Sequence, residues 1–254
     1  MIRFLRPLPD LEFQGEFIFP SPEKATREGI VCAGGNLSRG MVLSAYRQGI
    51  FPWYDDSSPI LWWSPNPRFV VFPSAFHVPK SARKLAKREG WTFSLDRAFP
   101  QVIVGCASVE RPRQDGTWIV PEMIEAYMAL HEDGYAHSLE VWENGNLIGG
   151  LYGLSLGAIF FGESMFSLKS GASRAGFLRL GSFLFGNGFL CIDSQVRTDD
   201  IAGMGGREIP RTQYLGILKS ALAYPDRIGD WGSLFPTFDA SGSVLGVENF
   251  HDMA

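Results

Sequence analysis

Residues 137–167 read HSLEVWENGNLIGGLYGLSLGAIFFGESMFS, and residues 190–195 read LCIDSQ. Hydrophobic and polar residues alternate at the start of this stretch, and Asn144-Gly145 divides it with the strongest short signal for a β-hairpin. A second turn at 155–157 predicts one more strand, so we expect an antiparallel meander. Its strands are predicted over 137–143, 146–154 and 158–163, followed by a helix over 172–187 and a strand over 189–195.

Two carboxylates lie in the strand-like parts of this stretch. Side chains alternate between the faces of a strand, so Asp193 and Gln195 are predicted to share one face, with Glu163 at the end of the neighbouring strand. Burying a carboxylate is costly unless a cation or hydrogen-bond donors meet it. For Glu163, a salt bridge to an internal Arg and a contact with a cationic ligand both remain open, and Asp193 could be a hydrogen-bonded strand terminus or a functional group.

Outside this stretch, the sequence indicates two domains. Residues 36–49 predict a capped helix that ends at Gly49, and the segment from 50 to 67 is rich in aromatic residues and prolines that favour rigid loops. We expect these aromatic residues either to pack between layers or to stack on a nucleic-acid base. The predicted class is α+β, with a small N-terminal domain over 1–66 and a larger domain over 67–254; the latter also contains a strand over 91–95 and helices over 121–131 and 208–223.

Five cations are predicted to share one face of a helix over 79–90. Their spacing is i, i+3, i+4, i+7 and i+8, and they are Lys80, Arg83, Lys84, Lys87 and Arg88. Like charges at these spacings weaken an isolated helix. The face is therefore either solvated or a contact for phosphate groups.

The composition narrows the class of protein further. A net charge of −4 argues against a general nucleic-acid binder, although a local basic patch remains compatible with it. Cys32, Cys106 and Cys191 are far apart, which predicts reduced core thiols rather than disulfides or a zinc site. The first residues contain no apolar segment long enough for a signal peptide, and no membrane span follows. We expect a cytoplasmic monomer with no metal and no cofactor.

The predicted order of meander, helix, strand and helix resembles the GNAT acyltransferase fold. In that fold, a glycine-rich loop and a helix N-terminus after the third strand hold coenzyme A. The corresponding residues 167–173 contain a single glycine, so the coenzyme signature is weak. A likeness of fold does not establish the acyl donor.

Eight short motifs in fixed order resemble the bacterial leucyl/phenylalanyl-tRNA protein transferase family. They are GGNLS (34–38), AYRQGIFPWY (45–54), WWSP (62–65), TWI (117–119), AHSLEVW (136–142), GGLYG (149–153), FFGESMFS (160–167) and IDSQ (192–195). The resemblance extends from about Phe17 to Leu218. It implies transfer of Leu or Phe from aminoacyl-tRNA to proteins that begin with Arg or Lys, which creates an N-degron, and it leaves open whether Met is also a donor.

The resemblance also implies roles for individual residues. Glu163 would bind the cationic side chain of the acceptor, and the catalytic residues Asp193 and Gln195 would position its amine and help to remove a proton, with a ribose hydroxyl as an equally reasonable proton carrier. The pocket for the donor side chain would be formed by Leu151, Phe160, Met165, Leu180 and Ile192. The terminal adenosine would contact Trp53, Trp118 and Tyr127, and the cationic helix face would contact the tRNA body.

Three positions depart from the family pattern. Ser194 replaces the usual Cys and is predicted to point away from Asp193 and Gln195, while Asp200 and Gly203 replace the usual His and Ser. Two other functions remain open. One is a coenzyme A-dependent N-acetyltransferase on the same fold, and the other is a non-catalytic reader of N-degrons in which Glu163 binds basic N-termini.

Overall fold

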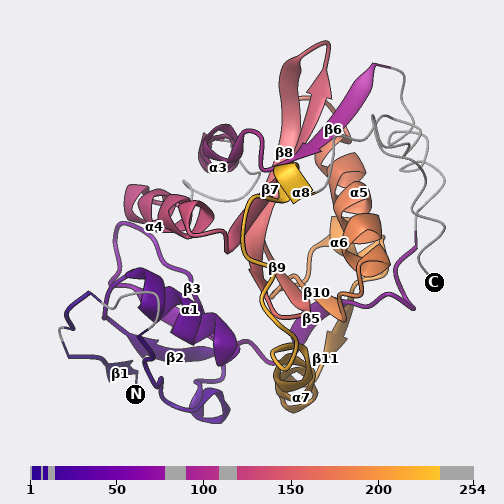
Figure 1. The fold of residues 1–254 in the computed structure, drawn as a ribbon. Helices are drawn as coiled ribbons and strands as arrows, with labels where there is room; N and C mark the ends of the chain where they lie inside the picture. The colour runs from indigo at the N-terminus through magenta and orange to yellow at the C-terminus, as the bar shows by residue number, and fades with distance from the viewer. Residues whose placement is uncertain (1, 7, 11–14, 78–89, 109–118, 235–254) are drawn as a thin grey trace.

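The structure, a computed structural model, describes residues 2–6, 8–10, 15–77, 90–108 and 119–234. Figure 1 shows a small sheet with one helix next to a larger sheet with helices on both sides. The small sheet has the strand order β1-β2-β4-β3. Its elements are β1 (Arg3–Phe4), η1 (Pro22–Lys24), β2 (Ile30–Ala33), α1 (Arg39–Arg47), β3 (Phe51–Pro52) and β4 (Leu61–Trp63).

The larger sheet has the order β11-β5-β10-β9-β8-β7-β6. Its strands are β5 (Arg68–Val71), β6 (Trp91–Leu95), β7 (Ala136–Glu143), β8 (Asn146–Leu156), β9 (Ile159–Ser167), β10 (Cys191–Asp193) and β11 (Arg207–Ile209). Among the described strands of this sheet, only β9 and β10 pair in parallel. The predicted α+β class and the mixed, largely antiparallel sheet are confirmed.

The predicted meander is present as β7, β8 and β9. Asn144 and Gly145 have φ values of 52° and 77°, which suits the two central positions of a type I′ hairpin turn. Two boundaries differ from the prediction. β9 continues to Ser167, and the segment predicted as a helix from 208 begins as β11, with α7 (Arg211–Ala221) starting only after Pro210. Proline supplies no amide hydrogen to a sheet but suits the start of a helix, so the chain changes structure there.

Helices cover both faces of the larger sheet (Figure 1). α3 (Phe99–Ser108) and α4 (Pro121–Glu132) lie on one side, and α5 (Ala172–Gly186) lies on the other. The short helices α6 (Asp199–Ala202) and α8 (Trp231–Leu234) complete the described fold. No helix in the described ranges is both long enough and apolar enough to cross a membrane.

Two hydrophobic cores fill the space on the two sides of the larger sheet. The first contains α3 and α4 residues and continues into α1 through Tyr46 and into the small sheet through Trp62. The second lies between the sheet and α5. The three cysteines are buried and free, as predicted. We retain a domain boundary after residue 66 as a proposal, because the small sheet ends before it and β5 begins after it.

The arrangement of β9 and β10 decides where a site can form. Their parallel pairing covers only Cys191 with Ile159, Ile192 with Phe160 and Asp193 with Phe161. Beyond Phe161, β9 continues along β8, whereas β10 ends. The strands therefore part just before Glu163, and the chain after Asp193 is free to turn.

Candidate functional site

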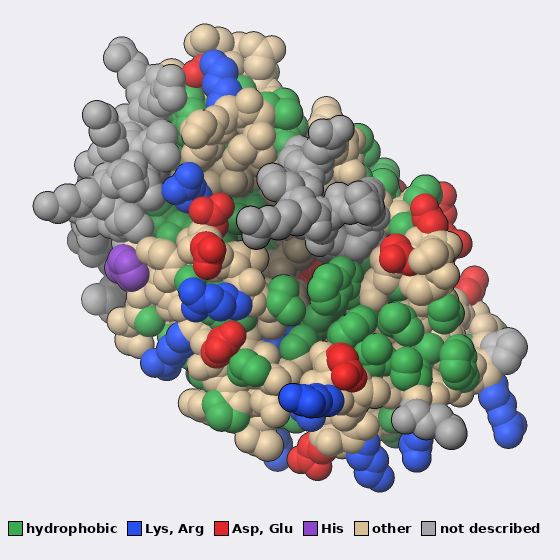
Figure 2. Space-filling model, turned by 180° about the vertical axis from the view of Figure 1, so that it is seen from behind, with side chains coloured by type: hydrophobic (Ala, Val, Ile, Leu, Met, Phe, Trp, Pro, Cys, Tyr) green, Lys and Arg blue, Asp and Glu red, His purple; other side chains and the backbone are tan. Residues whose placement is uncertain are grey.

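A cavity of about 600 Å³ opens where β9 and β10 part. Seen from behind, the molecule is hollowed near the centre of the view, with hydrophobic side chains gathered beside the hollow (Figure 2). The polar residues around the cavity include Glu163, Ser164, Ser194, Gln195, Thr198, Asp199 and Asp200. Its apolar residues include Leu151, Phe160, Met165, Phe177 and Ile192. A mostly apolar cavity with a few polar groups is the usual form of a small-molecule site.

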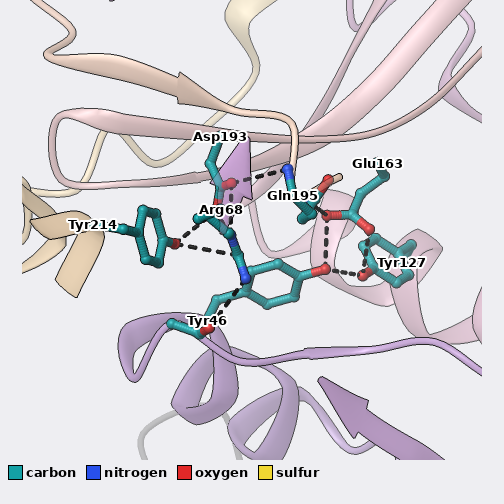
Figure 3. A network of polar contacts seen from close by, with 8 residues as sticks. Tyr46, Arg68, Tyr127, Glu163, Asp193, Gln195 and Tyr214 are labelled. Atoms are coloured by element: carbon teal, nitrogen blue, oxygen red, sulfur yellow. Dashed lines mark hydrogen bonds and ion pairs between the residues drawn. The ribbon is translucent and has the colours of Figure 1, made fainter. Parts of the chain in front are cut away.

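Glu163 is held by three neutral donors at the wall of this cavity (Figure 3). The Tyr46 hydroxyl donates to Oε1 at 2.7 Å, and the Tyr127 hydroxyl donates to Oε2 at 3.1 Å. Gln195 Nε2 also donates to Oε1, at 3.1 Å. The two tyrosine hydroxyls contact each other as well. Among the described residues, no Lys, Arg or His forms an ion pair with Glu163.

Burial raises the pKa of Glu163 to about 7. The hydrogen bonds from Tyr46 and Tyr127 oppose this rise, and the negative charge of Asp193 adds to it. Burial, and then the charge of Glu163, raise the pKa of Tyr46 and of Tyr127 well above the usual 10, so both hydroxyls keep their protons. Glu163 therefore changes its charge near neutral pH, whereas the Tyr46 and Tyr127 hydroxyls that donate to it stay protonated.

Asp193 has an internal cationic partner. Its Oδ1 accepts from Arg68 Nε at 2.9 Å, and its Oδ2 accepts from Arg68 Nη2 at 2.6 Å. The Tyr214 hydroxyl also donates to Oδ2, at 2.7 Å. Arg68, Asp193 and Tyr214 are all 0% exposed. The salt bridge to an internal Arg that we considered for Glu163 therefore belongs to Asp193.

Gln195 lies between the two carboxylates. Its backbone N–H donates to Asp193 Oδ1 at 3.0 Å, while its side chain reaches Glu163. The predicted strand over 189–195 is wrong at both ends, because β10 covers only Cys191–Asp193 and Gln195 has a left-handed φ of 54°. Strand alternation therefore does not orient Gln195. Ser194, which was predicted to point away from Asp193 and Gln195, is one of the residues that line the cavity together with Gln195.

The residues predicted for the donor pocket are mostly together. Leu151, Phe160, Met165 and Ile192 line the cavity. Leu180 is only 1% exposed in the second core and is not among the lining residues. Phe177, three residues earlier on the same helix, lines the cavity instead.

The residues predicted to contact the adenosine lie in different places. Trp53 lines the cavity, and its ring centroid is 5.3 Å from that of Trp63. Tyr127 is 0% exposed and contacts Glu163. Trp118 and the five cations Lys80, Arg83, Lys84, Lys87 and Arg88 lie outside the described residues.

Sequence reasoning missed Tyr46, Arg68 and Tyr214. Arg68 is the first residue of β5 and is followed by the apolar residues 69–71. A charge at the start of a buried strand was the one available signal that Arg68 has a buried partner. Its partner is 125 residues away, so no local pattern identifies it. In the described ranges, no group of three or more His, Cys, Asp or Glu side chains could hold a metal ion.

Comparisons with known proteins agree on one family. Residues 70–219 match the family described as leucyl/phenylalanyl-tRNA protein transferase, and residues 35–66 match its N-terminal domain. A leucyl/phenylalanyl-tRNA–protein transferase of Syntrophus aciditrophicus (strain SB) is 48% identical over 222 residues, covering 87% of this chain and 93% of that protein. One from Myxococcus xanthus (strain DK1622) is 49% identical over 214 residues, covering 84% and 92%.

Solved structures are only distantly similar. L-PGS from Bacillus licheniformis matches with a TM-score of 0.37 and 15% identity over 54% of this chain and 48% of that one. A GCN5-related N-acetyltransferase from Kribbella flavida matches with a TM-score of 0.33 and 12% identity over 67% and 61%. Neither likeness is close enough to bear on the reaction.

Proposed function

The chain belongs to the leucyl/phenylalanyl-tRNA protein transferase family and is an aminoacyltransferase, and we propose that its acceptors are proteins that begin with Arg or Lys. Leu or Phe is transferred from aminoacyl-tRNA to the α-amino group of the acceptor, and Met is a further candidate donor. The product carries a new N-terminal residue and is marked as an N-degron. We also propose that the protein acts as a cytoplasmic monomer.

The observation that supports this acceptor class is the environment of Glu163. Its carboxylate faces a largely apolar cavity, is held by hydroxyl and amide donors, and has no ion-pair partner among the described residues. A carboxylate in such a place is stabilised when a ligand brings a cation. The ammonium of Lys and the guanidinium of Arg both meet this need.

The apolar part of the cavity is proposed to take the donor side chain. Leu151, Phe160, Met165 and Ile192 offer aliphatic and aromatic contacts, and Phe177 joins them. Full burial of a Leu or Phe side chain contributes about 1.5–3 kcal/mol, and each missing methylene costs about 0.8 kcal/mol. Discrimination against smaller aliphatic donors should therefore be modest.

The reaction forms a peptide bond and breaks the ester bond to the terminal ribose of the tRNA. The acceptor amine, in its neutral form, attacks the ester carbonyl and a C–N bond forms. The C–O bond then breaks, and the ribose oxygen leaves with the proton that the amine nitrogen gives up. The ester is already activated, so no covalent intermediate on the protein is needed. We propose that Gln195, which lines the cavity, orients the amine, and that Asp193 acts through Gln195, because its oxygens are occupied and buried.

Contacts with the tRNA are proposed at two places. Trp53 lines the cavity and can stack on the terminal adenosine, together with Trp118. Tyr127 donates to Glu163 from the interior of the protein and so supports the cavity wall next to the proposed adenosine contact. The cations Lys80, Arg83, Lys84, Lys87 and Arg88 are proposed to contact phosphates of the tRNA body.

A labelling experiment tests the proposal against its rivals. The protein is incubated with radiolabelled Leu-tRNA and a peptide that begins with Arg, and in parallel with labelled acetyl-CoA and the same peptide. We expect label in the peptide from the tRNA donor alone. Label only from acetyl-CoA would identify an N-acetyltransferase, and peptide binding without label from either donor would identify an N-degron reader.

A further inference from the structure

A buried group behind the cavity wall contains two residues, Arg68 and Tyr214, that have no assigned part in the reaction. It consists of Arg68, Asp193 and Tyr214, and none of these three side chains is exposed (Figure 3). Arg68 uses Nε and Nη2 as a fork on the Asp193 carboxylate, and its Nη1 donates to the Gly49 carbonyl at 3.3 Å. The guanidinium carbon lies 4.4 Å from the centre of the Tyr214 ring, so the ring also stacks on the cation.

The side chains of this group hold one another in place, because the charge of Arg68 is paired with that of Asp193 and the carboxylate accepts a further hydrogen bond from Tyr214. A planar fork fixes both the distance and the angle of a carboxylate, which a point charge does not. Tyr214 is the second donor at Oδ2, after Arg68 Nη2, and its hydroxyl lies 3.3 Å from that nitrogen. Burial first, and then the Asp193 charge, raise the pKa of Tyr214 well above 10, although Arg68 opposes this, so its hydroxyl remains a donor.

The group reaches the cavity through one backbone amide. Asp193 Oδ1, which Arg68 Nε holds, also accepts the N–H of Gln195 at 3.0 Å. Gln195 has a φ of 54°, a left-handed conformation that residues other than glycine adopt at a cost and keep only where their surroundings impose it. The carbonyl of Gln195 is held as well, because it accepts the N–H of Phe69 at 3.1 Å. The bond to Asp193 Oδ1 is the constraint from a side chain, and it helps to set where the Gln195 side chain leaves the backbone at the cavity wall.

We propose that Arg68 and Tyr214 are positioning residues for aminoacyl transfer, which fix the Asp193 carboxylate so that it holds Gln195 in the conformation that meets the acceptor amine. The inference rests on the proposed function. Asp193 then serves as an anchor of fixed geometry and not as the group that takes the proton from the amine. Within the described residues, no donor contacts Gln195 Oε1, so this oxygen is left to receive the amine.

The test is Tyr214→Phe, which removes one hydroxyl and keeps the buried ring. Because small errors in position slow a reaction strongly, we expect kcat to fall on the order of tenfold, with the KM values for Leu-tRNA and for an Arg peptide unchanged. The matched control is Tyr135→Phe, which removes the hydroxyl of another buried tyrosine, 7% exposed, away from Asp193. It should leave kcat unchanged. An unchanged kcat in Tyr214→Phe, or an equal fall in the control, would overturn the inference.

A double substitution separates positioning from general damage to the fold. If Tyr214 acts through Gln195, adding Tyr214→Phe to Gln195→Ala should not slow single-turnover transfer further. Independent effects that multiply would contradict the inference. Arg68→Lys, which replaces the fork by a point charge, should slow kcat like Tyr214→Phe if it folds. Failure of the proposed function would show differently, as absence of peptide labelling by the unsubstituted protein.

Discussion

Glu163 is the residue whose charge state controls the proposed site. Its pKa of about 7 lies above the usual 4.5, so it gains a proton more readily in the folded protein than in the unfolded chain. The protonated form therefore favours folding, and this contribution is lost as the pH rises from about 4.5 to about 7. A bound cation, in contrast, needs the ionised form. Without a ligand, the contribution of Glu163 to the stability of the fold is therefore greatest at low pH. Binding of a cation by Glu163 is favoured at high pH, where the carboxylate is ionised.

The first prediction concerns the pH dependence of acceptor binding. As the pH falls through about 7, Glu163 becomes neutral, so we expect the KM for an Arg peptide to rise, and we expect Glu163→Gln to remove this dependence. Initial rates measured at a series of pH values on both proteins give the result. A KM that rises equally in the two proteins would assign the titration to another group.

The second prediction concerns acceptor choice. Removing one partner of a buried charge pair costs about 2 kcal/mol or more, which corresponds to about 30-fold. Glu163→Gln should raise the KM for Arg and Lys peptides by about this factor and leave binding of Leu-tRNA nearly intact. Glu125→Gln, at an exposed position on α4, is the control and should change neither. Equal loss of peptide and tRNA binding in Glu163→Gln would contradict the assigned role.

At the scale of single elements, β8 shapes the cavity through a glycine. The pairing of β8 with β9 shifts register between Tyr152 and Gly153. A Cβ at Gly153 would lie 2.1 Å from the Phe161 carbonyl oxygen and 2.6 Å from the Phe160 ring. Phe160 lines the cavity, so any side chain at this position would displace both a strand and a wall of the proposed donor pocket.

The third prediction follows from this crowding. Gly153→Ala should lower the free energy of unfolding by about 1–3 kcal/mol, because the neighbouring backbone must move. Gly216→Ala is the opposite case, since its Cβ would meet nothing within 4 Å in the middle of α7. It should raise stability by about 0.5–1 kcal/mol. Urea unfolding of both variants measures the two effects, and the prediction fails if Gly153→Ala is as stable as the unsubstituted protein.

At the scale of the whole molecule, the small sheet and the larger one share the site. Tyr46 of α1 donates to Glu163 of β9, and the Gly49 carbonyl accepts from Arg68 of β5. The first hydrophobic core also runs from Trp62 to Tyr127. The N-terminal residues are therefore part of the machinery around Glu163 and Asp193 rather than a separate attachment.

The fourth prediction concerns the overall electrostatics of tRNA binding. The net charge is −4, so attraction to the tRNA must come from a local cluster. If all five cations between Lys80 and Arg88 contact phosphates, log K should fall with log salt with a slope of roughly −3.5 to −4.5, from about 0.7 to 0.9 per contact. Lys84→Ala combined with Lys87→Ala should reduce the slope by about 1.4 to 1.8. Binding of deacylated tRNA across a salt series measures this, and an unchanged slope would place the contacts elsewhere.

Patterns within a few residues of one another were enough to predict the meander, the crossover helix and the family motifs. Alternation, the Asn144-Gly145 turn and helical spacing depend only on near neighbours in the chain, and the structure contains the predicted meander, this turn and the helix α5. The same patterns extended β10 too far and missed β5 and β11, which are only a few residues long.

Tertiary structure alone decided which carboxylate is paired and which one faces the cavity. Arg68 and Asp193 are 125 residues apart, and Tyr46 and Glu163 are 117 residues apart. Such contacts follow from how strands and helices pack, since they leave no period or spacing in the chain. The sequence placed Glu163 and Asp193 near each other at two strand ends. Folding paired Asp193 with Arg68 and left Glu163 at the cavity wall, because β5, which carries Arg68, lies next to β10 and not next to β9.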